Sequence, residues 1–168
     1  NVLPFWLQNS QDKEFGGYFT CLDREGKVFD TDKFIWLQGR EVWMFSMLYN
    51  KVEKRQEWLD CAVQGGEFLK KYGHDGNYNW YFSLDRSGRP LVEPYNIFSY
   101  TFATMAFGQL SLATGNQEYA DIARKTFDII LSKVDNPKGK WNKLHPDTRN
   151  LKNFALPMIL CNLAMEIE

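Results

Sequence analysis

An aromatic ring and a guanidinium group share one face of a predicted helix early in the chain. Trp36 and Arg40 are four residues apart, a spacing that places side chains next to each other on a helix. An indole ring packs on the C–H faces of a sugar, while an arginine donates fork-shaped hydrogen bonds to hydroxyls or to an oxyanion. The pair therefore predicts one wall of a pocket for a sugar-like ligand. The alternative interpretation is a packed tryptophan beside a structural arginine that pairs with Glu41 or another carboxylate.

The sequence contains an internal repeat, and a second set of candidate binding residues lies in its second unit. Phe98 occupies in the second repeat the place that Trp36 has in the first, so an aromatic ring is present at both positions. Asn96 and Ser99 flank it with polar groups that are able to reach a ligand. The alternative interpretation is an aromatic stripe in the core with a solvated Asn96.

The patterns of histidine and cysteine do not indicate a further catalytic or metal site. His74 and His145 fall in turn-like segments without the spacing of metal ligands, so we expect loop residues without a catalytic role. The odd cysteine count, without CxxC spacing, indicates neither a disulfide framework nor a zinc site, and we expect reduced thiols in a cytoplasmic protein. Cys61 and Cys161 lie in helical patterns and are expected in the core.

The elements that must position these residues recur at a nearly fixed offset along the chain. The segment Leu22-Asp23-Arg24-Glu25-Gly26 returns as Leu84-Asp85-Arg86-Ser87-Gly88. The segment Gln56-Glu57-Trp58 returns, at almost the same offset, as Gln117-Glu118-Tyr119. A fixed period of this kind is typical of architectures in which one supersecondary unit packs against the next.

Each repeat is predicted to hold a short β-hairpin followed by two helices. Apolar spacing and turn residues place these elements at 17–26, 34–50 and 57–71, then at 79–90, 96–113 and 117–134, with a strand-like stretch at 140–142 and a helix from about 155 to 168. Gly65 and Gly66 inside the second helix indicate close packing. The pattern predicts an all-α fold, an (α/α) toroid in which the first helix of each pair lines the inside and the second forms the outside.

Length and charge narrow the class of protein. The 168 residues hold fewer than three repeats and end in an apolar helical pattern, so we expect a single, incomplete domain over residues 1–168 of a longer protein. A net charge of −1 argues against a nucleic-acid partner. No apolar stretch approaches the roughly 18 residues of a membrane span, and no signal peptide is evident, so we expect no membrane association.

Several segments, in order along the whole chain, carry a resemblance to a known family: Pro4-Phe5-Trp6, Asp12 to Phe19, Cys21 to Gly26, Trp36-Leu37-Gln38-Gly39-Arg40, Gly65 to Leu69, Asn96-Ile97-Phe98-Ser99 and Ala155-Leu156-Pro157-Met158. The chain resembles roughly the first half of a member of the N-acylglucosamine 2-epimerase family, also called renin-binding protein in mammals. The resemblance implies an (α/α)6 barrel.

The resemblance also implies sugar 2-epimerase chemistry. A C2 proton is removed from the opened sugar to give an enediolate, and reprotonation on the other face gives the epimer. Arg40 matches the family's active-site arginine, Trp36 and Phe98 match pocket aromatics, and Ser99 matches a polar contact. The two acid–base histidines lie in the second half of a family member, and neither His74 nor His145 matches them.

The substrate that the resemblance implies is an N-acylhexosamine, most closely N-acetylglucosamine and N-acetylmannosamine. Phe98 favours this branch, because cellobiose epimerases carry Tyr there, whereas Tyr100 departs from the acidic residue usual in the branch. No cofactor is required, and ATP activation, known for some N-acylglucosamine epimerases, is left open. This chain alone is expected to be catalytically inactive.

Two other classes of function stay open. An (α/α)6 glycoside hydrolase would need paired carboxylates, and Glu41 is the only obvious acid beside the candidate site. A non-catalytic half-barrel that binds a sugar or a protein would expose apolar faces through which it could form a homodimer.

Overall fold

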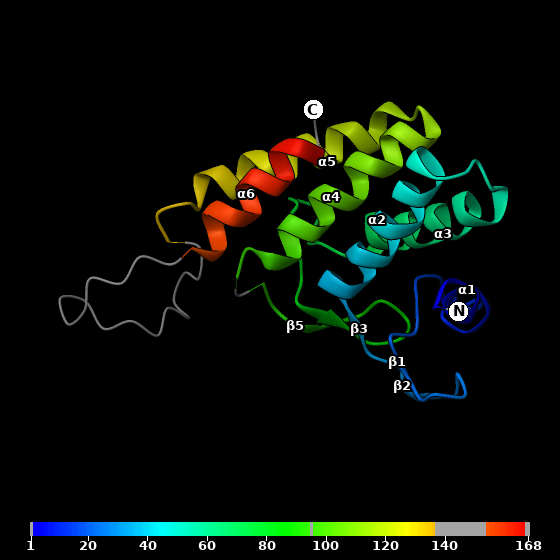
Figure 1. Ribbon diagram of the computed structural model, residues 1–168. Coiled ribbons are helices and arrows are strands. Elements are labelled where there is room, and N and C mark those ends of the chain that lie inside the picture. Colours follow the sequence, from blue (N-terminus) through cyan, green and yellow to red (C-terminus); the bar gives the residue numbers. More distant parts are fainter. Residues whose placement is uncertain (1, 95, 137–153, 167–168) are drawn as a thin grey trace.

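Two helical hairpins form most of the fold (Figure 1). The computed structural model describes residues 2–94, 96–136 and 154–166. Within them the helices are α1 (Val2–Asn9), α2 (Ile35–Lys51), α3 (Gln56–Tyr72), α4 (Phe98–Thr114), α5 (Gln117–Ser132) and α6 (Ala155–Glu166). The two predicted helix pairs are confirmed as α2–α3 and α4–α5, and α6 begins where the sequence predicts. The predicted strand at 140–142 and His145 lie outside the described residues.

The turn between α4 and α5 shows why the helix ends are readable from sequence. Gly115 caps α4 with a left-handed backbone, at a φ of 69°, which glycine adopts without a steric penalty. The side chain of Asn116 then accepts a hydrogen bond from the Glu118 N–H at 3.0 Å and caps α5. The predicted stop and restart are therefore confirmed.

The first helices of the two pairs, α2 and α4, pack against each other, while α3 packs on α2 and α5 packs on α4. Glycines allow these approaches. A side chain at Gly66 would collide with Leu110 of α4, and one at Gly65 would collide with the ring of Tyr18. The expectation of close packing at Gly65 and Gly66 is confirmed, although the partner of Gly65 is a loop residue and not a helix.

Small antiparallel sheets connect the helical hairpins. One pairs β1 (Cys21–Leu22) with β2 (Val28–Asp30), and the other has the order β3 (Lys33–Phe34), β4 (Ser83–Leu84), β5 (Pro90–Val92). The β1–β2 and β4–β5 hairpins are those that the sequence predicts. The strand β3 is an addition, and its register of Lys33 opposite Leu84 joins the first repeat to the second.

The helix α6 is the least buried of the long helices. Among its described residues only Leu156 and Leu163 are buried, whereas Met158 and Met165 are exposed. Cys61 is buried as expected, but the expectation of a core position for Cys161 is wrong, because this thiol lies on the exposed face of α6. Helix α1 has no counterpart among the elements predicted from the sequence.

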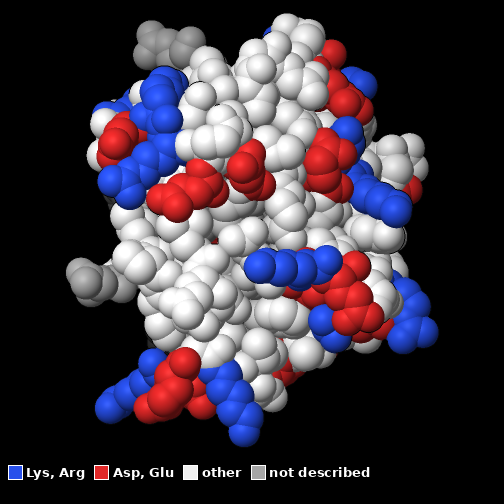
Figure 2. All heavy atoms as spheres, turned by 90° about the vertical axis from the view of Figure 1, so that its right-hand side faces the viewer, with Lys and Arg blue, Asp and Glu red and all other residues white. Residues whose placement is uncertain are grey.

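The distribution of surface charge agrees with the net charge of −1, and the helices agree with the absence of a long apolar stretch in the sequence. On the face shown in Figure 2, acidic and basic side chains alternate in small groups and form no extended patch of one sign. Among the helices of the described residues, none combines the length and the apolar character that crossing a bilayer requires.

Candidate functional site

The guanidinium group of Arg40 lies against two aromatic rings that also contact each other. Its central carbon is 5.9 Å from the ring centroid of Trp36 and 5.3 Å from that of Phe102, which belongs to α4. The two rings are 6.2 Å apart and tilted by 49°. Arg40 is exposed, and within the described part of the chain it forms no hydrogen bond or ion pair. Its N–H donors therefore remain available to a ligand.

A structural pairing of Arg40 with Glu41 is excluded by the orientation of Glu41. This carboxyl is buried, with 8% of the residue exposed, and hydrogen-bonds with the hydroxyl of Ser10. The same hydroxyl lies 2.7 Å from the carbonyl oxygen of Trp6. Burial raises the pKa of Glu41 to about 8, and the hydrogen bond with Ser10 offsets only part of this effect. Near neutral pH the carboxyl is therefore protonated and holds the end of α1 against α2.

The candidates from the second repeat lie at the beginning of α4. Phe98 is half-buried and opens the helix, one turn before Phe102, so both rings share a face of α4. Ser99 is 3% exposed and lies on a buried face. The side-chain oxygen of Asn96 accepts a hydrogen bond from the Phe98 N–H at 2.9 Å, so it orders the first turn of α4. The structure thus brings Trp36 and Arg40 together, with Phe98 and Ser99 on the neighbouring helix and Asn96 just before it.

Phe102 is the residue at the site that the motif analysis missed. It follows Arg40 by the same offset that separates Leu22 from Leu84, and it therefore occupies the matching position of the second unit. The repeat therefore relates Phe102 to Arg40 in the sequence, but only the packing of α2 on α4 shows that these two residues touch.

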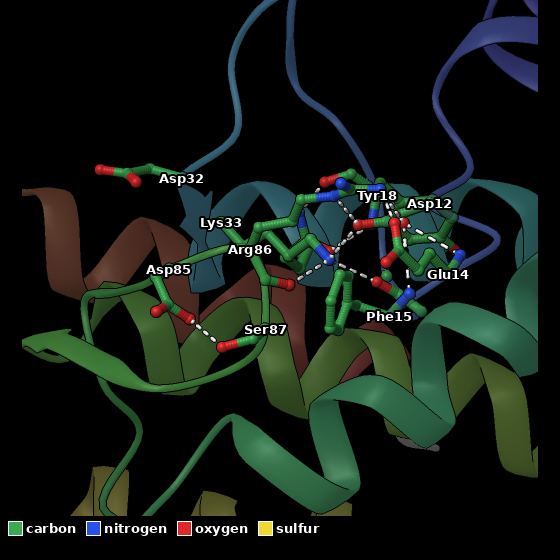
Figure 3. A network of polar contacts seen from close by, with 12 residues as sticks. Asp12, Glu14, Phe15, Tyr18, Asp32, Lys33, Asp85, Arg86 and Ser87 are labelled. Atoms are coloured by element: carbon green, nitrogen blue, oxygen red, sulfur yellow. Dashed lines mark hydrogen bonds and ion pairs between the residues drawn. The ribbon is translucent and has the colours of Figure 1, made fainter.

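A buried ionic network fixes the beginning of α2 (Figure 3). Lys33 lies two residues before α2. Its ammonium nitrogen lies 2.9 Å from Asp12 Oδ2, 2.9 Å from the Arg86 carbonyl oxygen and 2.5 Å from that of Gly16. Arg86 completes the network through its Nε, 3.0 Å from the same carboxylate oxygen, and through an ion pair with Glu14 at 2.9 Å. Three segments far apart in sequence therefore meet at Lys33, next to the beginning of α2.

The charges of this network are set by opposing effects. Burial would raise the pKa of Asp12, but hydrogen bonds from Arg86 and Lys33 outweigh it and lower the pKa to about 2. Burial lowers the pKa of Lys33, and the bond to Asp12 offsets part of this. At the centre of the network Lys33 and Asp12 are shielded from water, whereas Arg86 and Glu14 are partly exposed.

Other chemistry-bearing groups do not form a second site among the described residues. His74 stacks on Tyr78 at 4.8 Å, its Nδ1 accepts the Gly76 N–H at 3.0 Å, and burial lowers its pKa. This supports the expected role of a loop residue. Across the described ranges no cluster of His, Cys, Asp or Glu has the composition of a metal site.

A carboxylate near the end of α6 connects the first helices of successive units. Glu166 Oε2 accepts hydrogen bonds from Trp43 Nε1 of α2 at 3.0 Å and from Gln109 Nε2 of α4 at 2.8 Å. Together with Glu41 it makes up the acidic side chains of the described parts of α2, α4 and α6. Both carboxyls are engaged with protein partners, so these helices present no free carboxylate pair of the kind that glycoside hydrolysis uses.

Comparison with known proteins gives one consistent picture. The sequence profile described as N-acylglucosamine 2-epimerase (GlcNAc 2-epimerase) matches residues 17–167. The N-acylglucosamine 2-epimerase of Bos taurus is 41% identical over 99% of this chain, which corresponds to 40% of the bovine protein. The chain therefore spans about 40% of the length of this relative.

Solved structures agree on the fold. The cellobiose 2-epimerase of Bacillus thermoamylovorans B4167 superposes with a TM-score of 0.70 at 29% identity, over 78% of this chain and 34% of that protein. A D-mannose isomerase superposes over 98% of this chain and 43% of its own, with a TM-score of 0.79 at 20% identity. The predicted all-α toroid, with short β-hairpins between the helices, is thereby confirmed as part of the (α/α)6 barrel found in these epimerases.

Proposed function

The chain belongs to the N-acylglucosamine 2-epimerase family, and we propose that it supplies Arg40 and one wall of the sugar pocket of such an epimerase. The observation that supports this most directly is the guanidinium, without an ion pair among the described residues, that lies against two touching aromatic rings, one on each of two adjacent first helices. The rings offer apolar surface to a sugar, and the guanidinium offers several donors to its oxygens.

The reaction in this proposal is inversion at C2 of an opened N-acylhexosamine. Removal of the C2 proton leaves an enediolate, whose negative charge develops on oxygen. Arg40 is always protonated and is therefore suited to stabilise that oxyanion but not to remove the proton. We assign the proton transfers to the two histidines that the family resemblance places in its second half, and these transfers need no redox or electrophilic cofactor.

N-acetylglucosamine and N-acetylmannosamine are the proposed sugars. The bovine relative carries the name of an N-acylglucosamine epimerase and is more similar to this chain than the cellobiose epimerase compared above. Phe98 agrees with this choice, because its ring carries no hydroxyl with which to bind a further sugar unit.

The test compares two arginines that both pack on a tryptophan ring. In the protein that carries this chain, Arg40→Gln is expected to lower kcat for formation of N-acetylmannosamine by on the order of 100-fold, as loss of an oxyanion donor does. Arg55→Gln is the matched control, since Arg55 lies 5.1 Å from the Trp58 ring but forms an ion pair with Glu53 at 2.7 Å. Equal activities of the two variants would contradict the role of Arg40.

A non-catalytic half-barrel remains the second candidate, because Phe154, Met158 and Met165 are exposed in and next to α6. Stabilisation by N-acetylhexosamines supports the epimerase proposal. Concentration-dependent dimerisation without any effect of sugar on thermal stability would instead support the half-barrel.

A further inference from the structure

We propose that Phe102 is a positioning residue that holds the guanidinium of Arg40 in place for the reaction. The inference rests on the proposed function, since it concerns how the arginine of that site is oriented. The Phe102 ring is closer to the guanidinium carbon than the Trp36 ring is, at 5.3 Å against 5.9 Å. The face of an aromatic ring carries partial negative charge and attracts a cation in this distance range.

Backbone packing fixes this contact. A Cβ atom added to Gly39 would lie 2.9 Å from the carbonyl carbon and oxygen of Phe102. Helices α2 and α4 therefore cross in direct contact at the residue that precedes Arg40. Because Phe102 belongs to the opposite helix, the position of its ring relative to Arg40 depends on the α2–α4 crossing and not on helix spacing alone.

An aromatic partner suits an arginine that must keep its donors free. Arg55 is held by the ring of Trp58 and also by the carboxylates of Glu53 and Glu57, at 2.7 and 3.5 Å, so part of its hydrogen-bonding capacity is occupied. Arg40 is held by rings alone within the described residues. A ring restrains the guanidinium through its face and leaves the N–H groups at its edge for an oxyanion.

The experiment compares variants of the protein that carries this chain. Phe102→Leu is expected to lower kcat by roughly 3- to 30-fold, the range for losing one cation–π contact, with a smaller change in KM. Phe102→Tyr keeps the ring and is expected to recover most of the loss. Phe127→Leu is the matched control, because Phe127 is also a partly buried ring packed on the core and has no contact with Arg40.

A double-mutant cycle separates positioning from general packing. If Phe102 acts through Arg40, then Phe102→Leu has little further effect on kcat in an Arg40→Gln background, which lacks the cation. Independent, additive losses would overturn the proposal, as would a Phe102→Leu variant as active as the Phe127→Leu control. Unchanged activity of Arg40→Gln would instead contradict the proposed function itself.

A spectroscopic measurement covers the case in which Phe102→Leu does not fold. In protein labelled with 15N-arginine, the Arg40 Nε–H proton is assigned by its loss in Arg40→Lys. Ring currents from Phe102 and Trp36 are expected to shift it from the position of a freely exposed arginine, and Phe102→Tyr is expected to preserve the shift. An Arg40 signal at the position of a free side chain in the unmodified protein would overturn the proposal.

Discussion

The ammonium nitrogen of Lys33 lies 2.9 Å from Asp12 Oδ2, and neither side chain has any exposed surface. The two residues are 21 apart in sequence and lie on different segments, one leading into α2 and the other in the loop after α1. A charge removed from water in this way is stable only while its partners are present. The position of α2, and with it Arg40, therefore depends on this ion pair.

Replacing Lys33 by methionine is expected to lower the free energy of unfolding by about 1–3 kcal/mol, because Asp12 loses its ammonium partner and keeps only Arg86 as a cation. Urea unfolding, followed by tryptophan fluorescence, measures the loss. The control Lys70→Met breaks partly exposed ion pairs with Glu67 and Glu118 and is expected to cost less than about 1 kcal/mol. Equal losses of unfolding free energy in the two variants would contradict the argument that the buried ion pair stabilises the fold more than the exposed one.

Glu41 predicts a pH dependence of stability. Its pKa is about 8 in the folded chain against an ordinary value of 4.5, so between these pH values the folded state holds a proton that the unfolded state releases. Stability is therefore expected to fall as pH rises from 4.5 towards 8, with a contribution from this group of about 5 kcal/mol at most. Urea unfolding at a series of pH values measures the slope.

The matched variant for this prediction is Glu41→Gln. Glutamine keeps the shape, stays neutral and is able to donate to the Ser10 oxygen, so the difference in stability between variant and unmodified protein should grow as pH rises. A constant difference across the range would show that Glu41 is ionised in the folded state.

The neighbouring glycines of α3 are expected to respond differently to alanine. At Gly65 the new methyl group meets the ring of Tyr18, whose hydroxyl is tied to the Cys61 carbonyl oxygen at 2.7 Å, and a loss of about 1–3 kcal/mol is expected. At Gly66 it meets the end of the Leu110 side chain, which is able to change rotamer. Alanine also gains about 1 kcal/mol in helix propensity, so Gly66→Ala should be close to neutral. Thermal unfolding of both variants measures the difference, and the reverse order of stabilities would contradict this account.

Removing the Glu166 carboxylate is expected to loosen α6. Glu166→Ala leaves Trp43 and Gln109 without their shared acceptor, and α6 has few other buried contacts. Amide hydrogen exchange over residues 155–166 should become roughly 10-fold faster or more, as expected for losing hydrogen bonds to a charged group, while that of α3 stays unchanged. The control Glu118→Ala, which removes an exposed partner of Lys70, should leave exchange in α6 as it is. Unchanged protection in Glu166→Ala would show that packing alone holds this helix.

The helices and hairpins were predictable because their signals are local. Each signal acts within a few residues: the helical spacing of apolar residues, the glycine at 115 that ends α4, and the Asp-containing turns. Because the pattern occurs twice, the elements predicted in one repeat support those predicted in the other. The pairing of Trp36 with Arg40 followed from helix spacing for the same reason. Cys161 was placed wrongly because an apolar helical pattern does not say which of its faces meets another helix.

The parts that escaped prediction depend on contacts between distant residues. Nothing near Lys33 in sequence marks it as buried, since its acceptors come from residues 12, 16 and 86. Phe102 meets Arg40 only because α2 and α4 cross at Gly39. Glu41 looked like a partner for Arg40 by adjacency, but consecutive helix residues point to different faces, and Glu41 faces Ser10.

The ladder between β3 and β4 has a consequence for how the chain is made. Arg86, whose carbonyl oxygen accepts from Lys33, lies 53 residues after it. At a synthesis rate of about 5–20 residues per second, the first repeat leaves the ribosome several seconds before the strand and turn that complete it. During that interval Lys33 lacks one of its acceptors and β3 lacks its partner strand. One sequence repeat is therefore too short to form this network on its own. The network needs the chain from Asp12 through Arg86.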